Sequence, residues 1–174
     1  MPSEIFQASG FAVPAEAVTE PLAGGIDPEN FTPRLLSLLS NVLVWRESNE
    51  MRKHFQLGTN DWRVISALAS RPGSSSSEVS DFLVLNKAVV SKSVNVLLKR
   101  GLVLLTDGAR GSRPMYLTQA GAKMHNDMLP ISVRGQEIIL ANLSEPEIRR
   151  LNDLLHRMLE QARELQTLEN DAQL

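Results

Sequence analysis

The sequence of 174 residues contains no cysteine. This absence excludes disulfide bonds, thiolate zinc sites, cysteine nucleophiles and thiol-based redox sensors together. No lysine or arginine occurs before Arg34, so the cationic start of a secretory signal is missing. No apolar run approaches the roughly 18 residues that a membrane span needs. These absences favour a soluble, cytoplasmic protein without a membrane segment.

The charge of the chain is distributed unevenly, although its net value is only −2. Residues 86–113 hold six cations against one anion, a net charge of +5. The rest of the chain holds 12 cations and 19 anions, a net charge of −7. A concentrated basic segment on an acidic body attracts polyanions locally and repels them elsewhere. The segment 86–113 is therefore the first candidate for a binding surface.

Residues 1–31 differ in composition from the rest of the chain. They carry five acidic residues, no basic residue and four prolines. This composition predicts a flexible or loosely docked acidic arm. Thr32 and Pro33 then predict a helix start, with the threonine as N-cap and the proline at the first helical position. The broadly apolar positions that continue to about Phe55 indicate a helix buried in a core or a subunit interface.

The next stretch predicts three successive helices. Thr59 is expected to cap the first, and Ser75 with Glu78 three residues later forms a capping box for a short second helix. Asn86 is expected to cap the third helix, which Gly101 ends. The apolar spacing predicts inward-facing side chains on these helices at Trp62, Ile65, Leu68, Ala69, Val79, Leu83, Val90, Val94, Leu97 and Leu98.

Two short strands are predicted after the third helix. Residues 102–106 form an apolar, β-rich run, Asp107 and the glycines that follow it form a turn, and residues 115–117 return as a second strand. The order of helix, short helix, basic helix and hairpin predicts a winged helix-turn-helix. The hairpin is the wing of that fold.

Two further helices are predicted after the hairpin. Thr118 is expected to cap the first, and Pro130 and Gly135 are expected to bend that helix rather than end it. The last helix begins at Ser144. Its apolar residues form a heptad seam, which is typical of a dimer interface, at Ile148, Leu151, Leu155, Met158, Ala162 and Leu165.

The polar face of the basic helix suits the major groove of double-stranded DNA, which accepts a helix of this width. Lys87 and Lys92 can neutralise phosphates or bind guanine, and Ser91 and Asn95 can reach base edges. A solvated surface helix is the competing interpretation of these charges, and the adjacent wing with its own arginines favours DNA. The candidate DNA-binding residues are Ser77, Asn86, Lys87, Ser91, Lys92, Asn95, Arg110 and Arg113.

The chain resembles the MarR family of transcriptional regulators from about Phe31 to Leu165. The resemblance is carried by "TNDWRVISALASRPGSSSSEVSDFLVLNKAVVSKSVNVLLKRGLV", by "SRPMYLTQAG" at the end of the wing and by "LSEPEIRRLNDLLHRMLEQAREL". It implies a mainly α fold with a small β-hairpin wing, in which a winged helix-turn-helix is flanked by N- and C-terminal dimerisation helices. The expected boundaries are an arm at 1–31, a dimerisation helix at 32–57, the DNA-binding domain at 58–118, dimerisation helices at 119–168 and a tail at 169–174.

The resemblance also implies a function. It implies an obligate homodimer that binds a pseudo-palindromic operator in double-stranded DNA, usually as a repressor that a small ligand releases. Ala109 and Gly111 stand where the family commonly has an Asp–Arg pair that steadies the wing. Val84 occupies a turn position that is often glycine, so we expect the backbone of this turn to adopt a conformation other than the one that glycine favours. Phe82 replaces a residue that is often polar, and is expected to join the core or an interface.

Two other function classes compete with DNA binding. A winged-helix protein that binds another protein and has lost its DNA is the stronger alternative, supported by the missing Asp–Arg pair and opposed by the intact basic stripe. An enzyme is disfavoured, because no nucleophile elbow or His–Asp pairing surrounds the serines. His54, His125 and His156 lie in three different predicted helices, where ordinary histidines are more typical than metal ligands. No cofactor is expected.

A small-molecule effector site is predicted near the first helix. Trp45, Arg46, His54 and Trp62 can line a crevice between the first helices and the dimer core, and an aromatic wall with one cation suits an aromatic carboxylate. The alternative stays open that both tryptophans belong to the core and that Arg46 is an exposed or dimer-paired cation.

Overall fold

The computed structural model describes residues 13–108 and 111–171, with side chains up to Glu164. The chain divides into two units, residues 1–39 and residues 40–174, and helix α1 runs through the boundary between them. The elements are α1 (Thr32–Phe55), α2 (Thr59–Ser70), α3 (Ser76–Leu83), α4 (Lys87–Lys99), β1 (Val103–Leu105), β2 (Met115–Leu117), α5 (Gln119–Leu140) and α6 (Glu145–Asp171). The mainly helical fold with a two-stranded hairpin confirms the predicted fold class.

In the first unit, residues 13–31 form turns, and no helix or strand occurs among them. Asp27 closes one turn by accepting hydrogen bonds from the side chain of Asn30 and the backbone N–H of Glu29, and these bonds lower the pKa of its carboxyl. Helix α1 begins one residue earlier than predicted. The carbonyl of Phe31 accepts the first helical bond, from Leu35, and Thr32 is already helical.

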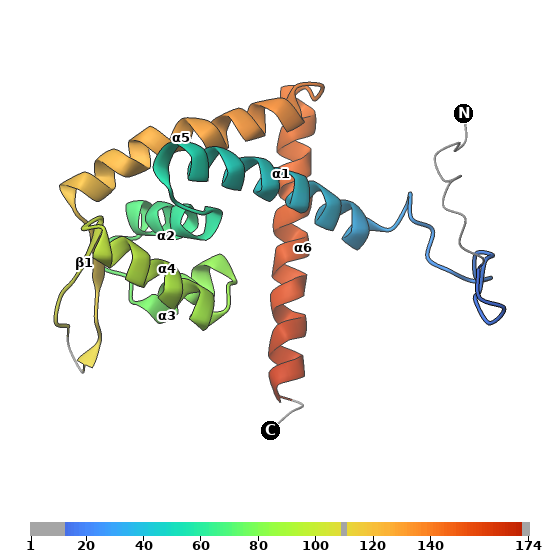
Figure 1. The fold of residues 1–174 in the computed structure, drawn as a ribbon, viewed down its shortest axis with the longest axis horizontal. Helices are drawn as coiled ribbons and strands as arrows, with labels where there is room; N and C mark the ends of the chain where they lie inside the picture. Colours follow the sequence, from blue (N-terminus) through green and yellow to red (C-terminus); the bar gives the residue numbers. More distant parts are fainter. Residues whose placement is uncertain (1–12, 109–110, 172–174) are drawn as a thin grey trace. The chain divides into compact units, whose positions relative to one another are not determined.

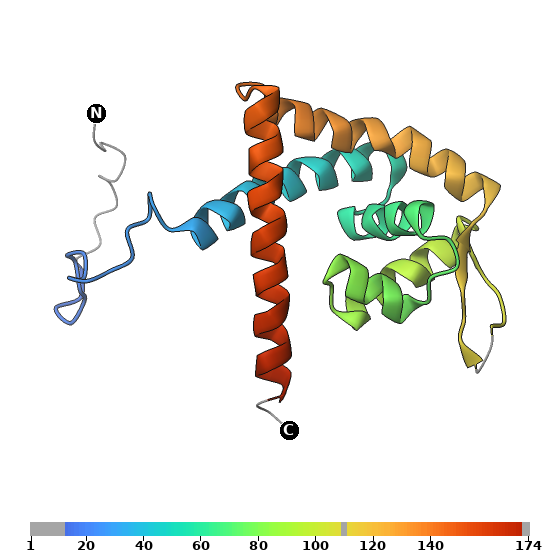
Figure 2. The ribbon, with the colours of Figure 1, turned by 180° about the vertical axis from the view of Figure 1, so that it is seen from behind.

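The core of the second unit lies among α2, α3, α4 and the hairpin. Figures 1 and 2 show the three short helices side by side with the hairpin at one end. Helix α2 packs against α3, α4 and α5, so it is the central element of this unit. The most deeply buried side chains come from all these elements and from the end of α1: Met51, Leu57, Ile65, Leu68, Val79, Val90, Leu97, Met115 and Met128.

Three helix starts were predicted correctly from local signals. The hydroxyl of Ser75 accepts the backbone N–H of Glu78, and the Glu78 carboxylate accepts both the backbone N–H and the hydroxyl of Ser75. These hydrogen bonds lower the pKa of Glu78. Asn86 caps α4 through the N–H of Ala88 at 2.8 Å, and Thr118 caps α5 through the N–H of Gly121 at 3.0 Å.

The start of α2 and one of its faces differ from the prediction. Gly58 occupies the N-cap, and its backbone N–H donates to Asp61 Oδ2 at 2.8 Å. Thr59 is the first helical residue, and its buried hydroxyl has no hydrogen-bond partner among the described residues. Ala69 is exposed, because α2 turns Val64 and Ala67 inward beside Ile65 and leaves the end of the helix in solvent.

The turn between α3 and α4 contains a strained valine. Val84 has φ 51° and ψ 46°, in the left-handed region, and its N–H donates to the carbonyl of Asp81 at 3.4 Å. The sequence predicted that a valine here requires another backbone solution, and this prediction was wrong. The turn keeps the conformation that glycine prefers, although a β-branched residue rarely adopts it.

Replacing Val84 with asparagine should therefore stabilise the protein. Asparagine tolerates the left-handed region, and the valine side chain is 56% exposed, so little packing is lost. We expect a gain of about 1 kcal/mol, measured by chemical unfolding. Val84→Ala is the matched control, because alanine also removes the branched side chain but lacks the short polar group that lets asparagine hydrogen-bond locally in this conformation. Equal stability of the asparagine and alanine variants would contradict the backbone explanation.

The wing is attached to the rest of the unit along β2. The strands are antiparallel, with Val103 opposite Leu117 and Leu105 opposite Met115. Met115 also pairs with the loop after α2: its carbonyl accepts the N–H of Gly73 at 2.9 Å, and its N–H donates to Ser74 at 3.1 Å. These two hydrogen bonds join β2 to the loop after α2 and fix the base of the wing against the helices.

Helices α5 and α6 leave much apolar surface exposed. Helix α5 continues through Pro130 and Gly135, so neither residue ends it. Ser144 precedes α6, and its hydroxyl and backbone N–H donate to Glu147, which lowers the pKa of that carboxyl. Large apolar side chains on these two helices are more than a third exposed, at Leu129, Val133, Ile138, Ile139, Leu151, Leu154, Met158 and Leu159.

Candidate nucleic-acid interface

Helix α4 separates an apolar inner face from a polar outer face. Val90, Val94 and Leu97 are 1%, 7% and 0% exposed, so the helix is fixed by its packing on α2 and α3. The opposite face carries the four predicted contact residues of this helix, and all are exposed: Lys87, Ser91, Lys92 and Asn95. A rigid helix with free polar side chains on one face is the arrangement that groove reading requires.

The two other polar candidates lie at helix starts. Asn86 is exposed, and its side-chain oxygen is occupied by the cap of α4, which leaves the amide NH₂ free to donate. Ser77 is exposed in the first turn of α3. Asn86 therefore caps a helix and still offers a polar group to a ligand, and Ser77 offers its hydroxyl from the first turn of α3.

The cations of this surface are available to a polyanion, with one exception. Lys87, Lys92 and Arg113 are exposed, and none forms an ion pair within the described ranges. Arg100 belongs to the same basic run, but its guanidinium donates to the carbonyls that end α1. The basic run therefore contains one cation with a structural partner, which local sequence patterns do not distinguish from the others.

The wing carries Arg113 just before β2, whereas Arg110 and its neighbour Ala109 lie outside the described residues. The hairpin closes through the N–H of Gly108, which donates to the carbonyl of Ser112 at 2.9 Å. A Cβ on Gly108 would overlap the hydroxyl of Ser112 and lie 2.7 Å from Pro114 Cδ. Glycine at this position therefore permits a tightly closed hairpin.

Of the two places predicted for Phe82, a core or an interface, the structure excludes the core. Its side chain is 37% exposed, and the guanidinium of Arg71 lies 4.1 Å from the centre of its ring. This cation–π contact joins the end of α2 to α3 and covers part of the ring. Phe82 is therefore a partly covered surface residue and does not belong to the core.

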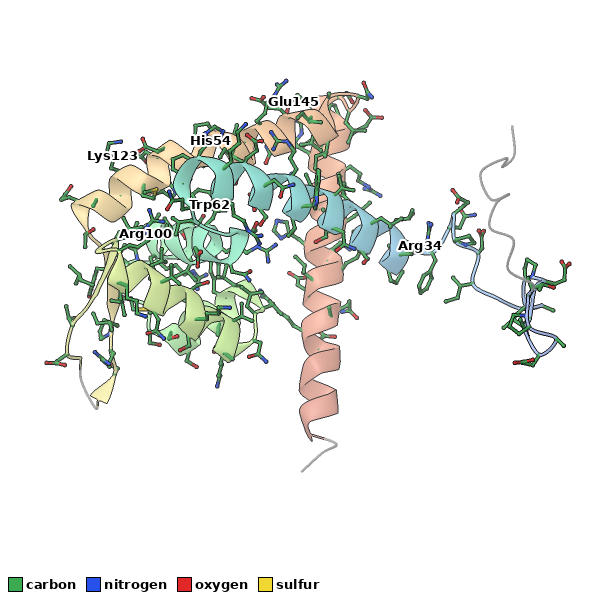
Figure 3. All side chains as sticks on the ribbon, viewed as in Figure 1. Arg34, His54, Trp62, Arg100, Lys123 and Glu145 are labelled. Carbon is green, nitrogen blue, oxygen red and sulfur yellow. The ribbon has the colours of Figure 1, made fainter. Side chains whose placement is uncertain are left out.

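The four candidate ligand residues have separate surroundings. Trp45 is 70% exposed on α1, and Arg46 donates from Nη1 to the carbonyl of Ile131 on α5 at 3.1 Å. His54 is exposed and lies 3.5 Å from Glu50 on the same helix. Trp62 is 6% exposed and stacks on His125, with ring centroids 5.3 Å apart. Trp62 and His54 are labelled in Figure 3.

A surface pocket of about 390 Å³ lies between α2, β2 and α5. Its lining includes Pro72, Tyr116, Ala122 and His125 and contains no aspartate, glutamate, lysine or arginine. His125 therefore links this pocket to the buried Trp62 through their stacked rings. The sequence did not predict this pocket, because one wall comes from the end of α2 and the other from β2 and α5, more than 40 residues further along the chain.

Two features of the described residues bear on other function classes. Within the described part of the chain, no group of three or more histidine, aspartate or glutamate side chains is placed to hold a metal ion. Among the same residues, no helix is long and apolar enough to span a lipid bilayer.

Residues 55–113 match the sequence profile of the MarR family. This match begins at the end of α1 and includes the helix-turn-helix, β1 and the turn of the wing. The chain therefore contains a MarR-family domain. No curated protein matches the chain.

Solved structures share the fold over a longer region than the MarR-family domain itself. A MarR/EmrR family regulator from Acinetobacter sp. ADP1 is 24% identical, with TM-score 0.74 over 80% of this chain and 99% of its own. A MarR regulator from Methanosarcina mazei Go1 is 22% identical, with TM-score 0.72 over 82% and 95%. The PcaV regulator from Streptomyces coelicolor, solved with its natural ligand, is 22% identical, with TM-score 0.68 over 79% and 98%. The helices that flank the MarR-family domain thus also follow this fold.

Proposed function

We propose that the protein is a homodimeric, sequence-specific transcriptional regulator that represses by binding a pseudo-palindromic operator. The observation that carries this proposal is the exposed cationic and polar face of α4, held by a buried apolar face and adjacent to a wing. In this proposal α4 is the recognition helix and enters the major groove of the operator, and the wing contacts the adjacent backbone or minor groove. Two-fold symmetry places the two α4 helices about one DNA turn apart.

The homodimer in this proposal forms through the exposed apolar surfaces of the flanking helices. In the second unit, Val42 and Trp45 on α1 are 65% and 70% exposed, and α5 and α6 carry further exposed apolar side chains. Exposed apolar surface of this extent is characteristic of a protein–protein interface. The partner in this interface is a second copy of the chain, because a homodimer has the two-fold symmetry that a pseudo-palindromic operator requires.

Substitutions on α4 and on the wing should have different effects on DNA binding. Ser91→Ala should relax the sequence preference and cost about 1–3 kcal/mol on the operator, because a lost base contact affects only the correct sequence. Changing Arg110 and Arg113 together to alanine should weaken operator and scrambled DNA alike, and should lower the salt slope by about one for each lost phosphate contact per subunit. The measurement is binding to both duplexes over a series of salt concentrations.

Ser48→Ala, a serine substitution on α1, is the control for Ser91, and Arg150→Ala on α6 is the control for the wing arginines. Both controls should bind both duplexes as the wild type does. An unchanged sequence preference in Ser91→Ala would remove Ser91 from the base contacts. Unchanged slopes and affinities in the double variant would mean that the wing does not touch DNA.

We propose that a small aromatic carboxylate releases the operator by binding at Arg46. The guanidinium has five N–H donors, of which the Ile131 carbonyl engages one, so further donors remain for a carboxylate. Trp45, the preceding residue of α1, is 70% exposed and is the aromatic side chain that this proposal assigns to the ligand. Arg46 also joins α1 to α5, so a ligand that draws its guanidinium away would change the contact between these helices.

Arg46→Ala should keep operator binding and lose its release by the ligand. A panel of aromatic carboxylates, beginning with benzoate and with benzyl alcohol as the neutral comparison, provides the probes. Operator release is measured with each probe for the wild type, Arg46→Ala and Arg52→Ala, an exposed arginine on the same helix that serves as control. Release of the Arg46 variant at the wild-type concentration of an active probe would exclude Arg46 from the site.

A further inference from the structure

Arg100 connects the end of the DNA-reading helix to the end of α1. It is the C-cap residue of α4, and its Nη1 donates to the carbonyl of Phe55 at 2.8 Å and to that of Gln56 at 3.3 Å. Figure 3 labels Arg100 at this end of α4. Phe55 is the last residue of α1, so a side chain from one helix terminus engages the terminus of another.

The carbonyls that Arg100 engages need a partner. The last carbonyls of a helix have no hydrogen bond within the helix and carry the negative end of its dipole. Gln56 follows α1 with a φ of 55°, in the left-handed region, and Leu57 then enters the core at 1% exposure. A guanidinium beside these carbonyls provides both the hydrogen bonds and the positive charge that stabilise such a helix end.

Gly101 and Leu102, which follow Arg100, connect to the start of α5 through their backbone carbonyls. The hydroxyl of Thr118 donates to the carbonyl of Gly101 at 2.7 Å, and the N–H of Thr118 donates to the carbonyl of Leu102 at 3.0 Å. Thr118 is the N-cap of α5. Three consecutive residues at the end of α4 therefore contact the last turn of α1 and the first turn of α5.

We propose that Arg100 is a positioning residue that fixes the angle of α4 relative to α1 and so sets the spacing of the two DNA half-sites. This inference rests on the proposed function, in which α1 belongs to the dimer interface and α4 reads the groove. A small rotation of α4 against α1 changes the separation of the two recognition helices in the dimer. Arg100 thus contributes to operator choice without touching DNA, although it belongs to the basic run.

Lys99 provides the matched control for Arg100. It is the preceding residue, carries the same charge, is exposed and has no hydrogen bond or ion pair within the described ranges. Arg100→Gln and Lys99→Gln therefore remove the same charge from the same helix end, and only the first removes the contact to α1. Arg100→Lys keeps the charge and replaces the planar fork by a single ammonium group.

The geometry is tested on the free protein. The chain has no cysteine, so spin labels can be attached to cysteines introduced at exposed Asn49 on α1 and exposed Ala88 on α4. Labelled protein diluted with excess unlabelled protein reports the distance within one protomer by pulsed electron spin resonance. Arg100→Gln should broaden or shift this distance distribution, and Lys99→Gln should not. An unchanged distribution in both Arg100→Gln and Arg100→Lys would overturn the proposal whether or not the protein binds DNA.

The consequence for DNA is tested with a duplex selected by the wild-type protein and with variants of it whose half-sites are moved by one base pair. Arg100→Gln should bind the selected duplex about tenfold more weakly, the loss expected for a charged hydrogen bond, and should discriminate less between spacings. Lys99→Gln should keep the spacing discrimination. If Arg100→Gln loses the same factor as Lys99→Gln on every duplex, Arg100 is one more DNA cation and the proposal fails. Failure of the wild type to bind any duplex would refute the proposed function and leave the spin-label result standing.

Discussion

Replacing Gly121 with alanine should destabilise the protein by about 3 kcal/mol, at the upper end of the usual cost of overpacking. Gly121 is buried in the first turn of α5, against the backbone of Leu102. A Cβ at this position would overlap the carbonyl oxygen of Leu102 and lie 3.0 Å from its carbonyl carbon. Backbone atoms cannot rotate away as a side chain can, so α5 must move. Chemical unfolding at fixed protein concentration measures the loss.

Gly135→Ala is the matched control for this prediction. Gly135 is also buried in α5, but its Cβ would meet Arg46 Nη1 at 3.4 Å, the far end of a flexible side chain. Because alanine is the better helix former by about 0.5–1 kcal/mol, this variant should be as stable as the wild type or more stable. Equal effects at the two glycines would contradict the close packing of α5 on Leu102.

Lysines on the apolar face of α6 should abolish the dimer and reduce operator affinity by at least about 100-fold, because the second half-site contact is lost with the partner. Leu151→Lys with Met158→Lys is the preferred variant. Both side chains are more than a third exposed in the protomer, so the fold of the protomer should survive. Deleting residues 144–174 should give the same loss of affinity, as a monomer or an aggregate. Sedimentation and operator binding are the measurements.

Lysines at Asp153 and Glu160 are the control, because these residues lie on the opposite face of α6. This variant should remain dimeric and bind the operator. A soluble Leu151 and Met158 variant, or a soluble truncation, that stays dimeric and binds DNA normally would contradict the assignment of α6 to the dimer interface.

Local sequence signals predicted most of the helix boundaries correctly. The caps at Ser75, Asn86 and Thr118 depend on hydrogen bonds to residues two or three positions away, so the sequence contains all the necessary information. The caps of α1 and α2 were each predicted one residue too late, and the error at α2 has the same local origin. Gly58 and Thr59 are both acceptable N-caps, and the aspartate at position 61 accepts the N–H of Gly58.

The backbone at Val84 shows a limit of residue preferences. Valine disfavours the left-handed region, yet the turn between α3 and α4 requires it for Leu85 to return to the core, where its N–H donates to the carbonyl of Ser80. Packing of the two helices thus decides the conformation of one exposed residue. The residue type at position 84 then changes the stability of the folded protein without changing the conformation of the turn.

The contacts that the sequence did not predict are those between distant segments. Arg100 and Phe55 are 45 residues apart, and nothing near Arg100 in the sequence separates it from the lysines that remain free. The stacking of Trp62 on His125 likewise joins α2 to α5. These pairs follow from the packing of whole helices, which also determines which cations of a basic segment stay available to DNA.

The central claim is that this chain binds DNA through the basic face of α4 and the wing. The most direct measurement is binding of the wild-type protein to a random-sequence duplex as the salt concentration is raised from a low value. We expect measurable binding at low salt, with the logarithm of the affinity falling linearly with the logarithm of salt by about 0.9 for each phosphate neutralised. No binding at the lowest salt, or binding that does not change with salt, would contradict the claim and favour a winged-helix protein that binds another protein.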